Sequence, residues 1–147
     1  MTATDQTFDT FNALLIGEIA AVETYSQVID KFDAAAIDTA LDRIRADHQE
    51  NVLELRKFIS NSALEPASGS GTWSGIQETL QIADALLGES PVLKNLQAGE
   101  ELGISQYENA LANADVSEAA KAIIKCTLLP ALSGHLIDLQ QRRDRTE

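Results

Sequence analysis

Hydrophobic residues recur at three- and four-residue intervals along most of the chain, the spacing that gathers side chains on one face of an α-helix. The first seam of this kind, over residues 8–32, consists of Phe8, Phe11, Leu15, Glu18, Val22, Tyr25, Ile29 and Phe32. The second, over residues 37–58, consists of Ile37, Leu41, Ile44, His48, Asn51, Leu55 and Phe58. The two seams predict two long helices that pack in a bundle and are joined by a short turn at residues 33–36.

The second half of the chain repeats this arrangement. Its first seam consists of Leu93, Leu96, Glu100, Gly103, Tyr107 and Ala110, and its second consists of Ile124, Leu128, Ala131 or Leu132, His135 and Leu139. Ser90 followed by Pro91 predicts the start of the third helix, because serine caps a helix and proline suits the first helical position. Asp115 with Glu118 three residues later resembles a capping box before the fourth helix. Pro130 lies inside that fourth helix and should bend it.

Residues 61–89 carry no long seam and separate the two halves. Serine and glycine fill residues 68–71, which predicts a loop, and Trp73–Leu87 has the pattern of one short helix that stops at Gly88. We expect this segment to be a crossover that returns the chain along the bundle, with Trp73 buried against it. The predicted fold is all-α: an up-down four-helix bundle with a long crossover carrying a short extra helix, formed by residues 1–147 as one domain.

The charge of the chain limits its partners. It holds 11 basic against 23 acidic residues, a net charge of −12 that would repel a phosphate backbone, so we expect no nucleic-acid partner. No apolar run approaches the length of a membrane span, and the N-terminus has no signal-peptide pattern, so we expect a cytoplasmic protein. Cys126 is the only cysteine, which excludes an internal disulfide, and we expect it to be buried as a small hydrophobe. Homo-oligomerisation stays open, and no protein partner is indicated.

Each of the four seams carries one ionisable residue among its apolar positions that stands out as a site candidate: Glu18, His48, Glu100 and His135. A carboxylate on an apolar face is unfavourable unless it is paired or bound to a metal. The glutamates belong to a repeat, because Gly17-Glu18 and Gly99-Glu100 lie 82 residues apart and each glutamate is followed by a tyrosine seven residues later. The repeat predicts a pseudo-two-fold bundle in which the four residues meet at the centre.

Two kinds of site fit these residues. Two carboxylates and two imidazoles could hold one Fe, Mn or Zn ion through mixed nitrogen and oxygen ligands. They could also form a metal-free polar network that fixes the register of the helices. Tyr25 and Tyr107 should carry their hydroxyl groups towards the site as a second shell, and Arg45, one turn from His48, could neutralise a buried glutamate. The Glu-to-His spacing is 30 residues in the first half and 35 in the second, a difference that we expect to lie in turns and helix starts.

The chain resembles the ferritin-like superfamily, especially its rubrerythrin-type branch. It is more closely similar to a bacterial family of uncharacterised ferritin-like four-helix-bundle proteins, a domain of unknown function, from about residue 8 to residue 143. The similarity is strongest in Gly99-Glu100, in Tyr107-Glu-Asn-Ala-Leu, and in the helix with His135-Leu-Ile-Asp-Leu-Gln-Gln-Arg-Arg. In ferritin-like di-iron proteins each half supplies a glutamate and then a Glu-x-x-His motif. The resemblance implies that Glu18 and Glu100 match the first-helix glutamates and that His48 and His135 match the motif histidines.

The chain departs from that pattern at the motif glutamates. Arg45 stands three residues before His48, and Leu132 stands three residues before His135. The carboxylates that usually bridge two metal ions are therefore missing, which argues against a di-iron enzyme. We favour a non-enzymatic bundle protein with a central Glu/His polar layer, acting in stress response or protein interaction. The alternative is a protein that binds one Fe, Mn or Zn ion, and a di-iron-type oxidoreductase is the least favoured.

Overall fold

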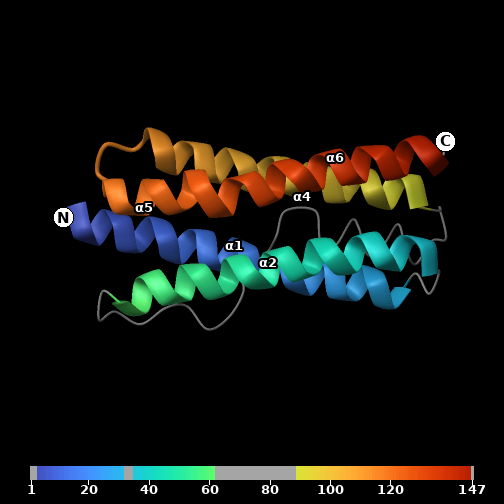
Figure 1. Ribbon diagram of the computed structural model, residues 1–147, viewed down its shortest axis with the longest axis horizontal. Coiled ribbons are helices and arrows are strands. Elements are labelled where there is room, and N and C mark those ends of the chain that lie inside the picture. The colour runs from blue at the N-terminus through green and yellow to red at the C-terminus, as the bar shows by residue number, and fades with distance from the viewer. Residues whose placement is uncertain (1–2, 32–34, 62–88, 147) are drawn as a thin grey trace.

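The computed structural model describes residues 3–31, 35–61 and 89–146, and within these ranges the chain is almost entirely helical. The helices are α1 (Ala3–Lys31), α2 (Ala35–Asn61), α4 (Glu89–Ala112), and a continuous stretch made of α5 (Glu118–Ile123), the π-helix η1 (Ile124–Leu128) and α6 (Leu129–Thr146) (Figure 1). The expected all-α four-helix bundle is confirmed for this part of the chain. The expected crossover helix at Trp73–Leu87, and the burial of Trp73, fall outside the described residues.

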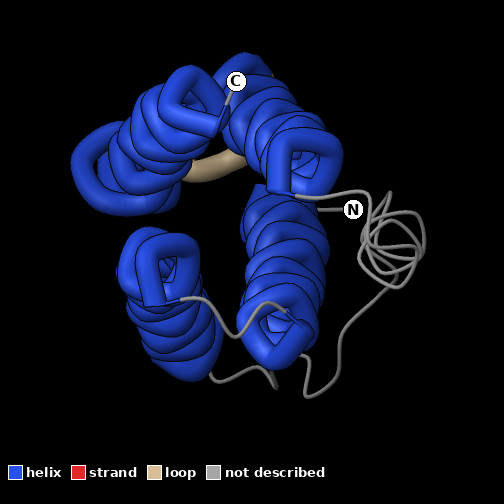
Figure 2. Tube along the Cα trace, turned by 90° about the vertical axis from the view of Figure 1, so that its right-hand side faces the viewer, coloured by secondary structure: helices blue, strands red, loops and turns tan. Residues whose placement is uncertain are grey.

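The helices pair into two antiparallel hairpins. Helix α1 packs mainly against α2, and α4 packs mainly against α6. Smaller contacts of α1 with α4 and of α2 with α6 join the two hairpins. Viewed along the bundle, the four helices surround a common interior (Figure 2). Side chains from all four helices can therefore meet at one level of the bundle.

The apolar core is divided into two clusters. One contains Phe11, Leu15, Leu55, Leu128 and their neighbours, and the other contains Val28, Leu41, Leu93, Leu139 and theirs. On every helix the ionisable residue of the seam lies between the stretches that supply the two clusters. Fully burying one Leu or Phe side chain stabilises a fold by about 1.5–3 kcal/mol. Apolar packing on both sides therefore holds the polar level in place.

The helix starts differ slightly from the predicted ones. Helix α4 begins at Glu89, one residue before the predicted cap, which is within the ordinary variation of helix ends. The predicted cap at Asp115 is wrong, because α5 begins at Glu118 with Ser117 as its cap. The Ser117 hydroxyl accepts a hydrogen bond from the Ala120 amide at 3.2 Å, and the Ser117 amide donates to Thr7 Oγ1 at 3.0 Å. This cap ties the start of α5 to α1.

The hydrogen bonding of the fourth helix changes just before Pro130. Residues Ile124–Leu128 form a π-helical turn, in which the Leu129 amide donates to the Ile124 carbonyl. Proline has no amide hydrogen to continue a regular α-helical pattern, and the change in this helix takes the form of a wider turn. The predicted bend of the helix axis at Pro130 stays a prediction. Cys126 lies in this turn and is exposed, so the expectation of a buried cysteine is wrong.

One helical stretch is apolar enough to pass a membrane-span test. Within Glu118–Asp144 an 18-residue window reaches a mean hydropathy of 1.4, so the expectation that no apolar run approaches the length of a membrane span is wrong for this helix. A single stretch of this kind is weak evidence for a membrane helix, because core helices of water-soluble bundles pass the same test. Of the apolar window, 28% is buried inside the bundle, including Ile124, Leu128, Leu132 and His135.

Candidate functional site

The four seam residues meet in one buried layer halfway along the bundle. The exposed fractions of their side chains and backbones together are 4% for Glu18, 1% for His48, 0% for Glu100 and 1% for His135. Each of the four long helical segments supplies one of them. The structure therefore brings together all four residues that the sequence singled out.

His48 joins the two glutamates. Its Nδ1 lies 2.5 Å from Glu18 Oε2, and its Nε2 lies 2.7 Å from Glu100 Oε1. An imidazole can donate from both nitrogens only when it is protonated. In the metal-free layer His48 is therefore an imidazolium between two carboxylates.

The environment shifts the acidity of this pair strongly. Burial alone would lower the pKa of His48, but the negative charges of Glu18 and Glu100 and the hydrogen bonds to them outweigh burial and raise that pKa to about 10. Burial alone would raise the pKa of Glu100, but the charge of His48 and the hydrogen bonds from both histidines outweigh it and lower that pKa to about 2. Both groups therefore remain charged at neutral pH in the metal-free layer.

His135 connects the layer to the surface. Its Nδ1 lies 3.2 Å from both carboxylate oxygens of Glu100, and its Nε2 lies 2.9 Å from Asp47 Oδ2. The Asp47 side chain is 55% exposed. Sequence reasoning missed Asp47, because it lies off the apolar seam of its helix. Its only sequence signal is its place directly before His48.

Two buried tyrosines bond the glutamates across the pseudo-two-fold repeat. Tyr25 donates to Glu100 Oε1 at 2.8 Å, and Tyr107 donates to Glu18 Oε1 at 2.6 Å. Each hydroxyl thus serves the glutamate of the other half. Burial raises the pKa of each tyrosine well above its ordinary value, and the charge of the bonded glutamate adds to the effect. Both tyrosines therefore act as donors.

Asn51 links the layer to the π-helical turn. Its Nδ2 lies 3.2 Å from Glu18 Oε1 and 3.3 Å from the carbonyl oxygen of Leu128 in η1. The sequence showed Asn51 as a polar interruption of the second seam, without assigning it a role. The structure makes it a buried donor shared by the layer and the fourth helix.

Arg45 lies farther out on α2 than the layer. Its guanidinium donates to Ser26 Oγ at 3.2 Å and to Asp42 Oδ1 at 3.1 Å, and its side chain is partly exposed. These contacts direct its charge to the bundle surface. The positive charge between the two glutamates comes from His48 instead.

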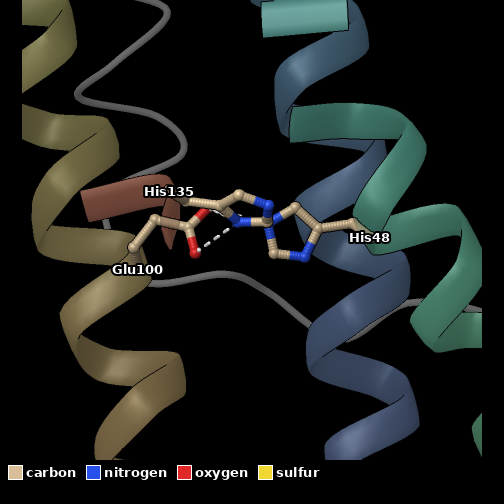
Figure 3. Close-up of side chains that lie close together, drawn as sticks. All are labelled: His48, Glu100 and His135. Carbon is tan, nitrogen blue, oxygen red and sulfur yellow. Dashed lines mark hydrogen bonds and ion pairs between the residues drawn. The ribbon is translucent and has the colours of Figure 1, made fainter. Parts of the chain in front are cut away.

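Three of the layer residues have the donor atoms of a metal site. One ligand atom each from His48, Glu100 and His135 lies within 4.8 Å of the others, and all three residues are buried. Figure 3 shows the Glu100 carboxylate facing the imidazole rings of both histidines. The remaining nitrogen of each ring faces a further carboxylate, Glu18 for His48 and Asp47 for His135. This cluster could hold a metal ion.

Fold and site together define a helical-bundle protein with one buried carboxylate–imidazole cluster. The chain belongs to the family described as Domain of unknown function (DUF2383), whose model matches residues 6–113. The matched segment includes Glu18, His48 and Glu100 and ends before His135. No curated protein and no solved structure matches the chain significantly. The expected membership of an uncharacterised family is confirmed, and the wider ferritin-like relationship stays a prediction.

Proposed function

We propose that the protein binds one divalent transition-metal ion between His48 Nε2, Glu100 and His135 Nδ1. The observation that carries this proposal is the pairing of each imidazole with two carboxylates. One of them, Glu100, is shared, and the other lies on the far side of each ring. In metal sites a ligating histidine usually donates its second N–H to a carboxylate or carbonyl, which fixes the ring and its tautomer.

The donor set indicates the kind of ion. Neutral imidazoles with one carboxylate suit Zn, Fe or Mn, and three protein ligands leave a coordination position open. Glu18, which the sequence analysis included among the ligands, acts in this proposal through His48. Asp47 acts in the same way through His135. A bound ion would replace the proton on His48 as the positive charge facing Glu100.

The pseudo-two-fold repeat of glutamate and tyrosine also supports a ferritin-like origin, which we propose for the bundle. In ferritin-like di-iron proteins, glutamates bridge the two metal ions. The residues at the corresponding positions here are Arg45 and Leu132, which supply no carboxylate, so the analogy extends to one ion only. Leu132 is buried and apolar, and the contacts of Arg45 lead away from the layer. A site for two bridged metal ions lacks its carboxylates here.

A second candidate function is a metal-free lock that fixes the register of the helices in a non-enzymatic bundle protein. It is favoured by one observation: among the described residues, no buried side-chain polar atom of the layer lacks a hydrogen-bond partner. A satisfied polar network can specify a unique packing without any ion. The two candidates differ in what a chelator does.

Elemental analysis of the full-length protein, purified without added metal, tests the proposal. We expect about one Zn, Fe or Mn ion per chain, consistent with one set of three ligands. Glu100→Gln should abolish binding, whereas the matched substitution Glu101→Gln on the exposed neighbouring residue should leave it unchanged. Protein that contains no metal, takes up none on titration and keeps its melting temperature with a chelator would show that the metal-free lock is correct.

A further inference from the structure

A cavity the size of one water molecule touches the layer where α1 faces α4. Its volume is about 10 Å³, and Glu18, His48 and Tyr107 line it on the side of the layer. A volume of roughly 10–15 Å³ is the least that accommodates a water molecule, which also needs polar neighbours. Both conditions are met here, because the three residues offer carboxylate, imidazole and hydroxyl groups.

A larger surface groove lies beside this cavity. It has a volume of about 270 Å³ and is lined by polar residues, which include Thr10, Asn109 and Asn113, and by the apolar residues Ala13, Leu14 and Ala110. Leu14 and Gln106 line both the groove and the inner cavity. Both spaces therefore border the side chains of Leu14 and Gln106, and Gln106 is exposed to solvent.

Glycine keeps the inner cavity open. A Cβ at Gly17 would lie 3.4 Å from Gln106 Oε1, an ordinary contact, so helix packing alone does not require glycine there. Gly103 differs, because its Cβ would come within 2.7 Å of Leu132 Cδ2. Glycine inside a helix is less stable than alanine by about 1 kcal/mol. At Gly17 the absence of a side chain leaves room beside the layer, although it makes the helix less stable.

We propose that the α1–α4 interface admits one water molecule to the layer at Glu18 and His48. The cavity volume sets the size limit, and the two buried carboxylates disfavour an anion. The inference rests on the proposed function only for its purpose, because Glu18 and His48 line the cavity whereas Glu100 and His135 do not. The route itself can be tested on the metal-free chain.

Solvent exchange of the His48 ring N–H protons measures this access. In full-length, metal-free protein labelled with ¹⁵N-histidine, Gly17→Ala places a methyl group in the cavity and should slow exchange about tenfold relative to the unmodified chain. Gly134→Ala is the matched control, since its Cβ would meet nothing within 4 Å, and it should leave the exchange rate unchanged. Gln106→Ala shortens a side chain shared by groove and cavity and should accelerate exchange.

The result that would overturn the route is equal exchange in Gly17→Ala and Gly134→Ala. Exchange rates that follow the unfolding free energies of all three variants would also overturn it, because exchange would then occur by opening of the whole bundle. The metal content of the unmodified protein is measured separately. Stoichiometric metal with no effect of Gly17→Ala contradicts the route alone, and no metal with slowed exchange contradicts the proposed function alone.

Discussion

At the scale of single residues, each ring nitrogen of His48 faces a different buried carboxylate. Removal of the His48 imidazole would leave Glu18 and Glu100 buried without the cation between them. Breaking a buried ion pair by removing one partner typically destabilises a protein by about 3–5 kcal/mol. The same reasoning gives Arg45 little weight, because a partly exposed pair such as that of Arg45 with Asp42 contributes about 0–1 kcal/mol.

We therefore expect His48→Ala to lower the free energy of unfolding of the metal-free protein by about 3–5 kcal/mol. Arg45→Leu should lower it by less than about 1 kcal/mol. Urea unfolding at neutral pH, followed by circular dichroism, measures both changes. Equal losses for the two variants would contradict the assignment of the layer's positive charge to His48.

The candidate site was predictable to the extent that its residues interrupt an apolar seam. Glu18, His48, Glu100 and His135 are ionisable residues at helical core positions, so their convergence followed from periodicity alone. Asp47 was not predictable in this way, because it is exposed on its own helix and reaches His135 only through the packing of α2 beside α6. The partners of Arg45, which are Ser26 and Asp42 rather than a buried glutamate, also depend on how the helices pack.

At the scale of helices, the seams predicted the four long elements, but they did not predict the π-helical turn η1. A π-helical turn contains one more residue than an α-helical turn between similar positions along the axis, and a hydrophobic pattern does not register so small a change. The extra residue accounts for part of the difference between the Glu-to-His spacings of 30 and 35 residues. The prediction that the difference lies in turns and helix starts is therefore incomplete.

Deleting Thr127, an exposed residue of η1, should therefore convert the π turn to α-helix and keep His135 in the layer. Deleting Ser105, an exposed residue of the regular helix α4, should rotate Tyr107 by about 100° relative to Glu100. We expect the first deletion to lower the unfolding free energy by less than about 3 kcal/mol and the second to abolish cooperative unfolding. Thermal melts of the two variants give the comparison, and an equally severe effect of both would contradict this account.

At the scale of the whole molecule, the shifted pKa values predict how stability depends on pH without metal. His48 contributes fully below its unfolded pKa of 6.5, and this contribution is lost as pH rises towards its folded pKa of about 10. Glu100 contributes fully above 4.5 and loses its contribution as pH falls towards about 2. The contribution of this pair is therefore greatest between pH 4.5 and 6.5.

Urea unfolding at a series of pH values, with a chelator present, should show stability falling between pH 7 and 9. With metal bound the sign should reverse, because the ion competes with protons for the histidines and binds more tightly as pH rises. A metal-free protein that becomes more stable between pH 7 and 9 would contradict the imidazolium assignment for His48.

The pairing of helices into two hairpins has a consequence for the order in which the protein folds. Each hairpin joins helices that follow one another in the sequence, α1 with α2 and α4 with α6. The long connection between α2 and α4 links the two hairpins. The layer instead joins residues that are distant in sequence, such as Tyr107 and Glu18, which are 89 residues apart. Contacts between distant residues form late, because closing a long loop has an unfavourable entropy.

Tyr107→Phe should therefore speed unfolding and leave the folding rate nearly unchanged. Phe58→Leu, at the hairpin contact with Phe11, should slow folding as well, and stopped-flow kinetics would separate the two.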